Sequence, residues 1–201
     1  MVTHANRGQD LETFIRYANS RYRATGEAII TKQPTEFLPI RDRRGVVVSC
    51  KVAEKSTVDF IGRVRNRPLA MEAKRTKGDS IRWAEVKDHQ AAFLTDFMGN
   101  GEGISLVVVS FDLRTFYAVP WAFWEAARTA WIKNPKSKVT VTHNGTTWTT
   151  NGKASVKESE LLPEWEVKMG GRIGLDYLRK YIEEEHHEIS NTDRESMLPV
   201  R

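Results

Sequence analysis

Apolar side chains recur along the chain with spacings that predict both helices and strands. Residues 10–26 carry them at the i, i+3, i+4, i+7 spacing of one buried helical face, and Gly26 can end this helix. Residues 81–99 show a similar stripe and predict a second helix, and "PWAFWEAARTAWI" predicts a third. The run "GISLVVVSF" is continuously apolar, which is typical of a strand covered on both faces of its sheet. "RTFYAVP" then continues the sheet.

Alternation of apolar and polar residues predicts further strands and two hairpins. Residues 27–32 read as a strand, and residues 37–55 predict a long β-hairpin with a basic tip at Asp42–Gly45. In residues 138–152, an Asn-Gly pair lies between two alternating runs, which predicts an additional hairpin. The segment "GLDYLRKYIEEEHHE" predicts a closing helix.

The order of these elements predicts the fold class. Helix, strands, helix, strand, helix indicates an α/β (α+β) domain with one mixed central β-sheet flanked by helices. We expect a single domain over residues 1–185, from which the 37–55 hairpin projects. Residues 186–201 predict a disordered acidic tail.

One predicted hairpin, "STVDFIGRV" followed by "PLAMEAK", carries charged residues that strand interiors disfavour. If its turn is centred on residues 65–66, Asp59 lies opposite Glu72 and Thr57 lies opposite Lys74. The two-residue period of a strand then puts all four on one face. The other face receives the apolar set Val58, Phe60, Leu69, Met71 and Ala73.

The facing carboxylates of Asp59 and Glu72 predict a metal site. Cβ atoms of directly opposite residues lie about 5 Å apart, and like charges there destabilise the sheet. A divalent cation removes this penalty, and hard oxygen donors suit Mg²⁺, with Mn²⁺ as a substitute. Thr57 can add a hydroxyl oxygen, and Lys74 can hold a water or a phosphate oxygen. A solvated strand face would explain Glu72 and Lys74 alone, but not Asp59 opposite them.

Gln90 lies on the apolar stripe of the second helix, where an amide must find a hydrogen-bond partner. Two interpretations stay open for it: Gln90 faces the metal or its waters, or it caps a backbone group at the sheet edge. The tryptophans Trp121, Trp124 and Trp131 similarly fit either the core or a subunit contact.

Charge points to a polyanionic partner. The net charge is +5, but residues 182–201 hold two basic and six acidic side chains, so the remaining residues carry +9. Residues 27–82 alone hold thirteen Lys/Arg against seven Asp/Glu. Such a distribution suits nucleic acid, although a basic solvated surface is an equal alternative from charge alone. A single cysteine, Cys50, excludes an internal disulfide, and no segment has the apolar length of a membrane span, so we expect a cytoplasmic protein.

Read in order, the motifs "NRGQDLE", "TKQPTE", "KSTVDFIG", "MEAKRTK" and "HQ" with "ISLVVVSF" resemble the RecU-type Holliday junction resolvases of Gram-positive bacteria and their phages. These belong to the PD-(D/E)xK nuclease superfamily, which has a restriction-endonuclease-like fold. The resemblance covers about three-quarters of the chain. It implies a homodimeric, Mg²⁺-dependent endonuclease that cuts four-way DNA junctions in recombination and repair, beside other recombination proteins.

The resemblance also implies roles for single residues. It places Thr57, Asp59, Glu72 and Gln90 around the metal, and it gives Lys74 the role of stabilising the transition state, so that Asp59, Glu72 and Lys74 are catalytic. The 37–55 hairpin becomes a stalk that enters the junction. The expected DNA contacts are Arg7, Lys32, Arg41, Arg43, Arg44, Lys55, Arg75, Lys77 and His89. A non-catalytic junction-binding modulator of recombination and a nuclease for other DNA remain the alternatives.

Overall fold

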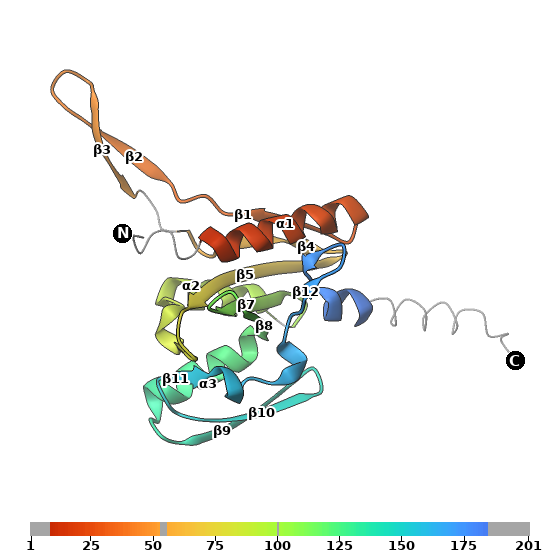
Figure 1. The fold of residues 1–201 in the computed structure, drawn as a ribbon. Helices are drawn as coiled ribbons and strands as arrows, with labels where there is room; N and C mark the ends of the chain where they lie inside the picture. Colours follow the sequence, from red (N-terminus) through yellow and green to blue (C-terminus); the bar gives the residue numbers. More distant parts are fainter. Residues whose placement is uncertain (1–8, 53–55, 100, 185–201) are drawn as a thin grey trace, which may run out of the picture.

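A five-stranded mixed sheet forms the centre of the computed structural model, which describes residues 9–52, 56–99 and 101–184 (Figure 1). The strand order is β1-β4-β5-β7-β8; β5 and β7 run parallel, and the other neighbouring pairs are antiparallel. The sheet strands are β1 (Ala28–Lys32), β4 (Phe60–Val64), β5 (Arg67–Thr76), β7 (Ile104–Phe111) and β8 (Thr115–Pro120). The predicted α/β class with a mixed central sheet is therefore confirmed.

Helices cover both faces of this sheet, which explains why β7 is buried along its whole length (Figure 1). On one face, α1 (Gln9–Thr25) and the segment around residues 175–182 enclose an apolar cluster that includes Leu11, Phe60 and Met71. On the other face, α2 (Asp88–Met98) and α3 (Trp121–Lys133) enclose a second cluster. Trp121 and Trp124 are buried in this second cluster, so they belong to the core rather than to a subunit contact.

Four short ladders surround the central sheet. The predicted stalk is the hairpin of β2 (Phe37–Arg41) and β3 (Val47–Val52), and Figure 1 shows it projecting far from the body. The predicted Asn-Gly hairpin is formed by β9 (Lys138–His143) and β10 (Thr146–Asn151) and packs against α3. The remaining elements are β6 (Ser80–Arg82), η2 (Trp83–Glu85), β11 (Ser155–Lys157), η3 (Glu158–Glu160), η4 (Pro163–Trp165), β12 (Met169–Gly170) and β13 (Gly174–Leu175).

Two predicted helices are shorter than expected. Residues 81–87 do not belong to the second helix, because β6 pairs with β11 and a single 3-10 turn follows. Ile81, Trp83 and Val86 are buried there without being helical. The closing segment first forms β13 and becomes helical at residue 179. The predicted tail, 186–201, lies outside the described residues.

The apolar face of the β4–β5 hairpin also needs a correction. Phe60, Leu69 and Met71 face the core as predicted, in the cluster that α1 covers, but Val58 lies in the cluster on the opposite side of the sheet. The strand begins only at Phe60, so the alternation of faces does not extend back to Val58.

Among the described residues, no helix combines the length and the apolarity that crossing a membrane would require.

Candidate active site

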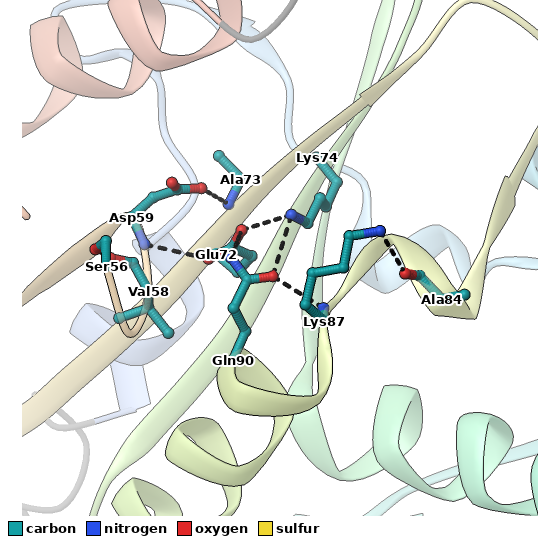
Figure 2. Close-up of polar contacts among 9 residues, drawn as sticks. All are labelled: Ser56, Val58, Asp59, Glu72, Ala73, Lys74, Ala84, Lys87 and Gln90. Atoms are coloured by element: carbon teal, nitrogen blue, oxygen red, sulfur yellow. Dashed lines mark hydrogen bonds and ion pairs between the residues drawn. The ribbon is translucent and has the colours of Figure 1, made fainter. Parts of the chain in front are cut away.

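The predicted register of the β4–β5 hairpin is confirmed, and it brings the two carboxylates together. Phe60 pairs with Met71, so Asp59 lies just before the strand and next to Glu72. The Asp59 backbone N–H donates to Glu72 Oε2 at 3.1 Å, and the Ala73 N–H donates to Asp59 Oδ2 at 2.9 Å (Figure 2). Each carboxylate is thus oriented by the backbone of the opposite segment.

Glu72 is the most enclosed member of the site, with 1% of its side chain exposed. Lys74 Nζ donates to Glu72 Oε1 at 2.6 Å, and Gln90 Nε2 donates to the same oxygen at 2.7 Å. Burial, followed by the negative charge of Asp59, raises the pKa of Glu72 to about 7, and Lys74 opposes both effects. This carboxyl group therefore changes its charge near neutral pH.

Gln90 reaches the site from the first turn of α2, where its amide caps a backbone group and also contacts Glu72. Its Oε1 accepts a hydrogen bond from the Lys87 backbone N–H at 2.9 Å, which caps the helix start. Because this contact fixes the oxygen, Nε2 points at Glu72, as Figure 2 shows. Gln90 thus donates to Glu72, a candidate metal ligand, and its expected place around a metal stays a prediction.

Thr57 is not assembled with the carboxylates in the same way. It is exposed and precedes β4, and among the described residues no hydrogen bond joins it to Asp59 or Glu72.

Glu12 of α1 is an acidic residue near the site that the sequence did not single out. It pairs with Lys32, at the end of the strand that adjoins β4. Its place in the sequence, directly after Leu11 of the apolar stripe, was the available signal.

The donor set fits a hard divalent cation. Asp59 and Glu72 supply carboxylate oxygens side by side, and the charge of Asp59 adds to the effect of burial on the pKa of Glu72. No group of three His, Cys, Asp or Glu in the described ranges is arranged to hold a metal. A cation here would thus have two carboxylates from the protein, and Mg²⁺ commonly binds in this way with water and phosphate oxygens completing its shell.

The stalk presents basic residues at its tip. Arg41, Arg43 and Arg44 are exposed, and Arg41 donates to the Gly45 carbonyl at 2.8 Å. Asp42 Oδ1 accepts from the backbone N–H groups of Arg44 and Val46, which closes the turn. The turn is therefore built locally, and it leaves the guanidinium groups of Arg43 and Arg44 available to a partner.

The other predicted DNA contacts differ in their surroundings. Lys77 and His89 are exposed. Arg75 is 13% exposed and forms an ion pair with Asp10 at 2.8 Å, and Lys32 pairs with Glu12. Arg7 and Lys55 lie outside the described residues.

Among the known proteins that this chain is similar to are Holliday junction resolvases named RecU. The Holliday junction resolvase RecU of Streptococcus sanguinis SK36 is 28% identical over 130 residues, which is 61% of this chain and 64% of that protein. The Holliday junction resolvase RecU of Staphylococcus epidermidis RP62A is 26% identical over 147 residues, 70% of each chain. The chain matches a little under two thirds of the length of the Streptococcus relatives.

One solved structure similar to this one is that of Archaeoglobus fulgidus Hjc, a Holliday junction resolvase. The TM-score is 0.35 at 11% identity, over 73% of this chain and 85% of that chain. The family model described as Recombination protein U, RecU, matches residues 6–181. This range includes the whole candidate site and most of the chain, and the protein therefore belongs to the RecU family.

Proposed function

We propose that this protein is a metal-dependent endonuclease that resolves four-way DNA junctions by phosphodiester hydrolysis. The observation that carries the proposal is the contact of Glu72 with both Asp59 and Lys74 in a chain of the RecU family. Relatives named Holliday junction resolvases support the choice of substrate.

Asp59 and Glu72 would hold Mg²⁺ or Mn²⁺. When bound, the cation would lower the pKa of a water molecule and neutralise charge on the phosphate. The Ala73 and Asp59 N–H groups keep the two carboxylates in place, so little reorganisation is needed. Lys74, whose side chain is 17% exposed, adds a fixed positive charge where charge develops on the phosphate.

The stalk would provide the preference for junctions. It projects from the body with arginines at its tip, and a junction has a central opening that a linear duplex lacks. Its two strands carry exposed apolar side chains, among them Phe37, Leu38 and Val48. Such side chains suit unstacked bases better than a continuous helix.

We also propose a homodimer that acts in the cytoplasm beside other recombination proteins. Resolution needs two nicks on symmetry-related strands, and a two-fold substrate is matched by a two-fold protein. Light scattering at micromolar concentration, with and without junction DNA, tests this part. A strict monomer under both conditions would contradict it.

A cleavage assay tests the proposed function. A labelled four-way junction and a duplex of the same sequence are each incubated with the protein in Mg²⁺ and in EDTA. We expect paired cuts near the junction in Mg²⁺ and none in EDTA. Junction binding without cuts would instead indicate a recombination modulator, and equal cutting of the duplex would indicate a nuclease for other DNA.

A further inference from the structure

A second basic region lies far from the stalk, on the β9–β10 hairpin and the end of α3. Residues 126–157 contain six Lys/Arg and no Asp or Glu. Lys133, Lys136 and Lys138 are exposed, and among the described residues they take part in none of the ion pairs. This charge has no role in the site or the stalk.

The backbone gathers these lysines at one place. Lys133 lies in the last turn of α3, and the Lys136 N–H donates to the Gly152 carbonyl at 2.9 Å. A Cβ atom at Gly152 would lie 2.7 Å from the Asn134 carbonyl oxygen, so glycine is what permits this close approach. Lys138 pairs with Asn151 at the base of the hairpin.

The outward face of the hairpin adds hydroxyl groups, which are hydrogen-bond donors like the lysine ammonium groups. Thr140 pairs with Thr149 and Thr142 with Thr147, with oxygen–oxygen distances of 2.9 Å. In each pair one hydroxyl proton is used between the two residues, and the other remains for an outside acceptor. All four threonines are exposed, whereas Trp148 and Val141 on the inner face pack toward the core.

The hairpin also connects physically to the active site. Trp83 Nε1 donates to the Lys153 carbonyl at 2.9 Å, and β6 pairs with β11 directly after the hairpin. Four residues after Trp83 comes Lys87, whose backbone N–H donates to Gln90 Oε1, and Gln90 in turn donates to Glu72. Figure 1 shows β9 and β10 beyond α3, on the side of the sheet away from α1.

We infer that the hairpin surface formed by Lys133, Lys136, Lys138 and the threonine pairs binds the phosphate backbone of a duplex arm. Ammonium and hydroxyl donors are the usual phosphate contacts. Protein interfaces, in contrast, are depleted in lysine and built around several apolar anchors. Here one exposed apolar side chain, Ile132, lies beside Lys133, and the outer face of the hairpin carries threonines. Lys153 is excluded, because it is already paired with Glu160. The inference rests on the proposed function, since it takes DNA as the partner.

The test compares two triple variants that remove the same charge. Lys133→Gln, Lys136→Gln and Lys138→Gln form the hairpin variant. Arg23→Gln, Lys168→Gln and Arg172→Gln form the control, whose residues are exposed at the end of α1 and around β12. Fluorescence anisotropy measures binding of a long-armed junction and of a duplex in EDTA, over a range of salt concentrations.

We expect the hairpin variant to bind both DNAs at least about tenfold more weakly at low salt. Its slope of log K against log salt should fall by about 0.9 for each phosphate that the variant no longer neutralises. The control variant should stay close to wild type in its DNA affinity and in its salt slope. Equal behaviour of the two variants, or a hairpin variant that changes oligomeric state with unchanged DNA binding, would overturn the inference. Wild type that binds but never cuts would contradict the proposed function alone, because binding in EDTA needs no cleavage.

Discussion

Gln90 donates its amide N–H to the carboxylate of Glu72, with 2.7 Å between Nε2 and Oε1. The orientation of this amide is set by the start of α2, where Gln90 Oε1 accepts from the Lys87 backbone N–H. A helix cap and a candidate catalytic carboxylate are therefore connected through a single side chain. The helix start therefore helps to orient the carboxylate of Glu72, which β5 already places beside Asp59.

The variant Gln90→Glu separates these two roles. Glutamate keeps the acceptor that caps Lys87, but it cannot donate to Glu72 and adds a third negative charge. Removal of a hydrogen bond to a charged group costs about 1.5–3 kcal/mol, so we expect cleavage to fall roughly 10- to 100-fold. The thermal midpoint should change little, because the cap remains. Single-turnover cleavage and thermal unfolding measure the two effects, and unchanged cleavage would rule out the positioning role.

Asp59→Asn should abolish cleavage and leave junction binding intact. The asparagine carbonyl can still accept from the Ala73 N–H, so the local fold is kept. Loss of the charge removes a metal ligand, an effect worth several kcal/mol, which corresponds to roughly 10³-fold in rate. Cleavage and anisotropy are measured in parallel on the same junction. A variant that cuts at nearly the wild-type rate would show that the metal lies elsewhere.

Lys74→Ala should be inactive even at saturating Mg²⁺, and its remaining metal binding should respond to pH. Lys74 lowers the pKa of Glu72, so its removal keeps Glu72 protonated to higher pH. The pH midpoint for Mg²⁺ binding should therefore shift upward from that of wild type, as followed by calorimetry from pH 6 to 9. Lys77→Ala is the control, because it also removes one lysine charge but at an exposed position three residues after Lys74. An unchanged midpoint would contradict the Lys74–Glu72 coupling.

Glu72 should make the metal-free protein less stable as pH rises. Its pKa in the folded state is about 7, above the ordinary 4.5, mainly because of burial. Between these values the folded state holds more protons than the unfolded state, so the free energy of unfolding decreases with increasing pH. In EDTA, wild type should lose up to about 3 kcal/mol relative to Glu72→Gln between pH 5 and pH 8.

Urea denaturation at the two pH values measures this difference, and Glu85→Gln at an exposed position is the control. A constant offset between wild type and Glu72→Gln reflects the amide itself, so only its change with pH is informative. If the difference does not change with pH, Glu72 is not the titrating group. Mg²⁺ added at pH 8 should restore stability to wild type and not to Glu72→Gln.

The sequence predicted the β4–β5 register correctly because its information is local. A two-residue turn with Arg65 at a φ of 49° joins strands whose apolar sets match only in one register. The beginning of the second helix was predicted wrongly for the opposite reason. Val86, Phe93 and Leu94 have a helix-like spacing, and the predicted helix was extended back from them to residue 81. Residues 80–82 instead form a strand whose partner, β11, lies more than 70 residues further along the chain. Pairing over that distance leaves no trace in local periodicity.

The role of Gln90 could be predicted only in part from sequence. An amide on an apolar stripe indicates that it has a hydrogen-bond partner, but it does not show which residue the partner is. The choice of Glu72 depends on where α2 starts, and that start moved from the predicted residue 81 to Asp88. Residue types thus identified the site, whereas the direction of each hydrogen bond came from tertiary structure.

The stalk should be removable without loss of the fold. Every described side chain of β2 is exposed, and the turn at Asp42 is closed by the hairpin's own atoms. Replacement of residues 37–52 by a short Gly-Ser linker should therefore leave the thermal midpoint within a few degrees of wild type. Junction affinity should drop toward that for duplex, because the element proposed to enter the junction centre is gone.

Arg43→Ala with Arg44→Ala tests the tip alone. Junction binding should weaken and depend less on salt, with a slope smaller by about 0.9 for each phosphate left without its arginine, while duplex binding changes less. Mg²⁺ binding, measured by calorimetry, should match wild type, because Asp59 and Glu72 lie at the β4–β5 pair of the central sheet and not in the stalk. Equally weakened binding of junction and duplex would make the tip a general charge patch. If the deletion weakens junction binding and the double alanine variant does not, the exposed apolar residues of β2 and β3 are what recognise the junction.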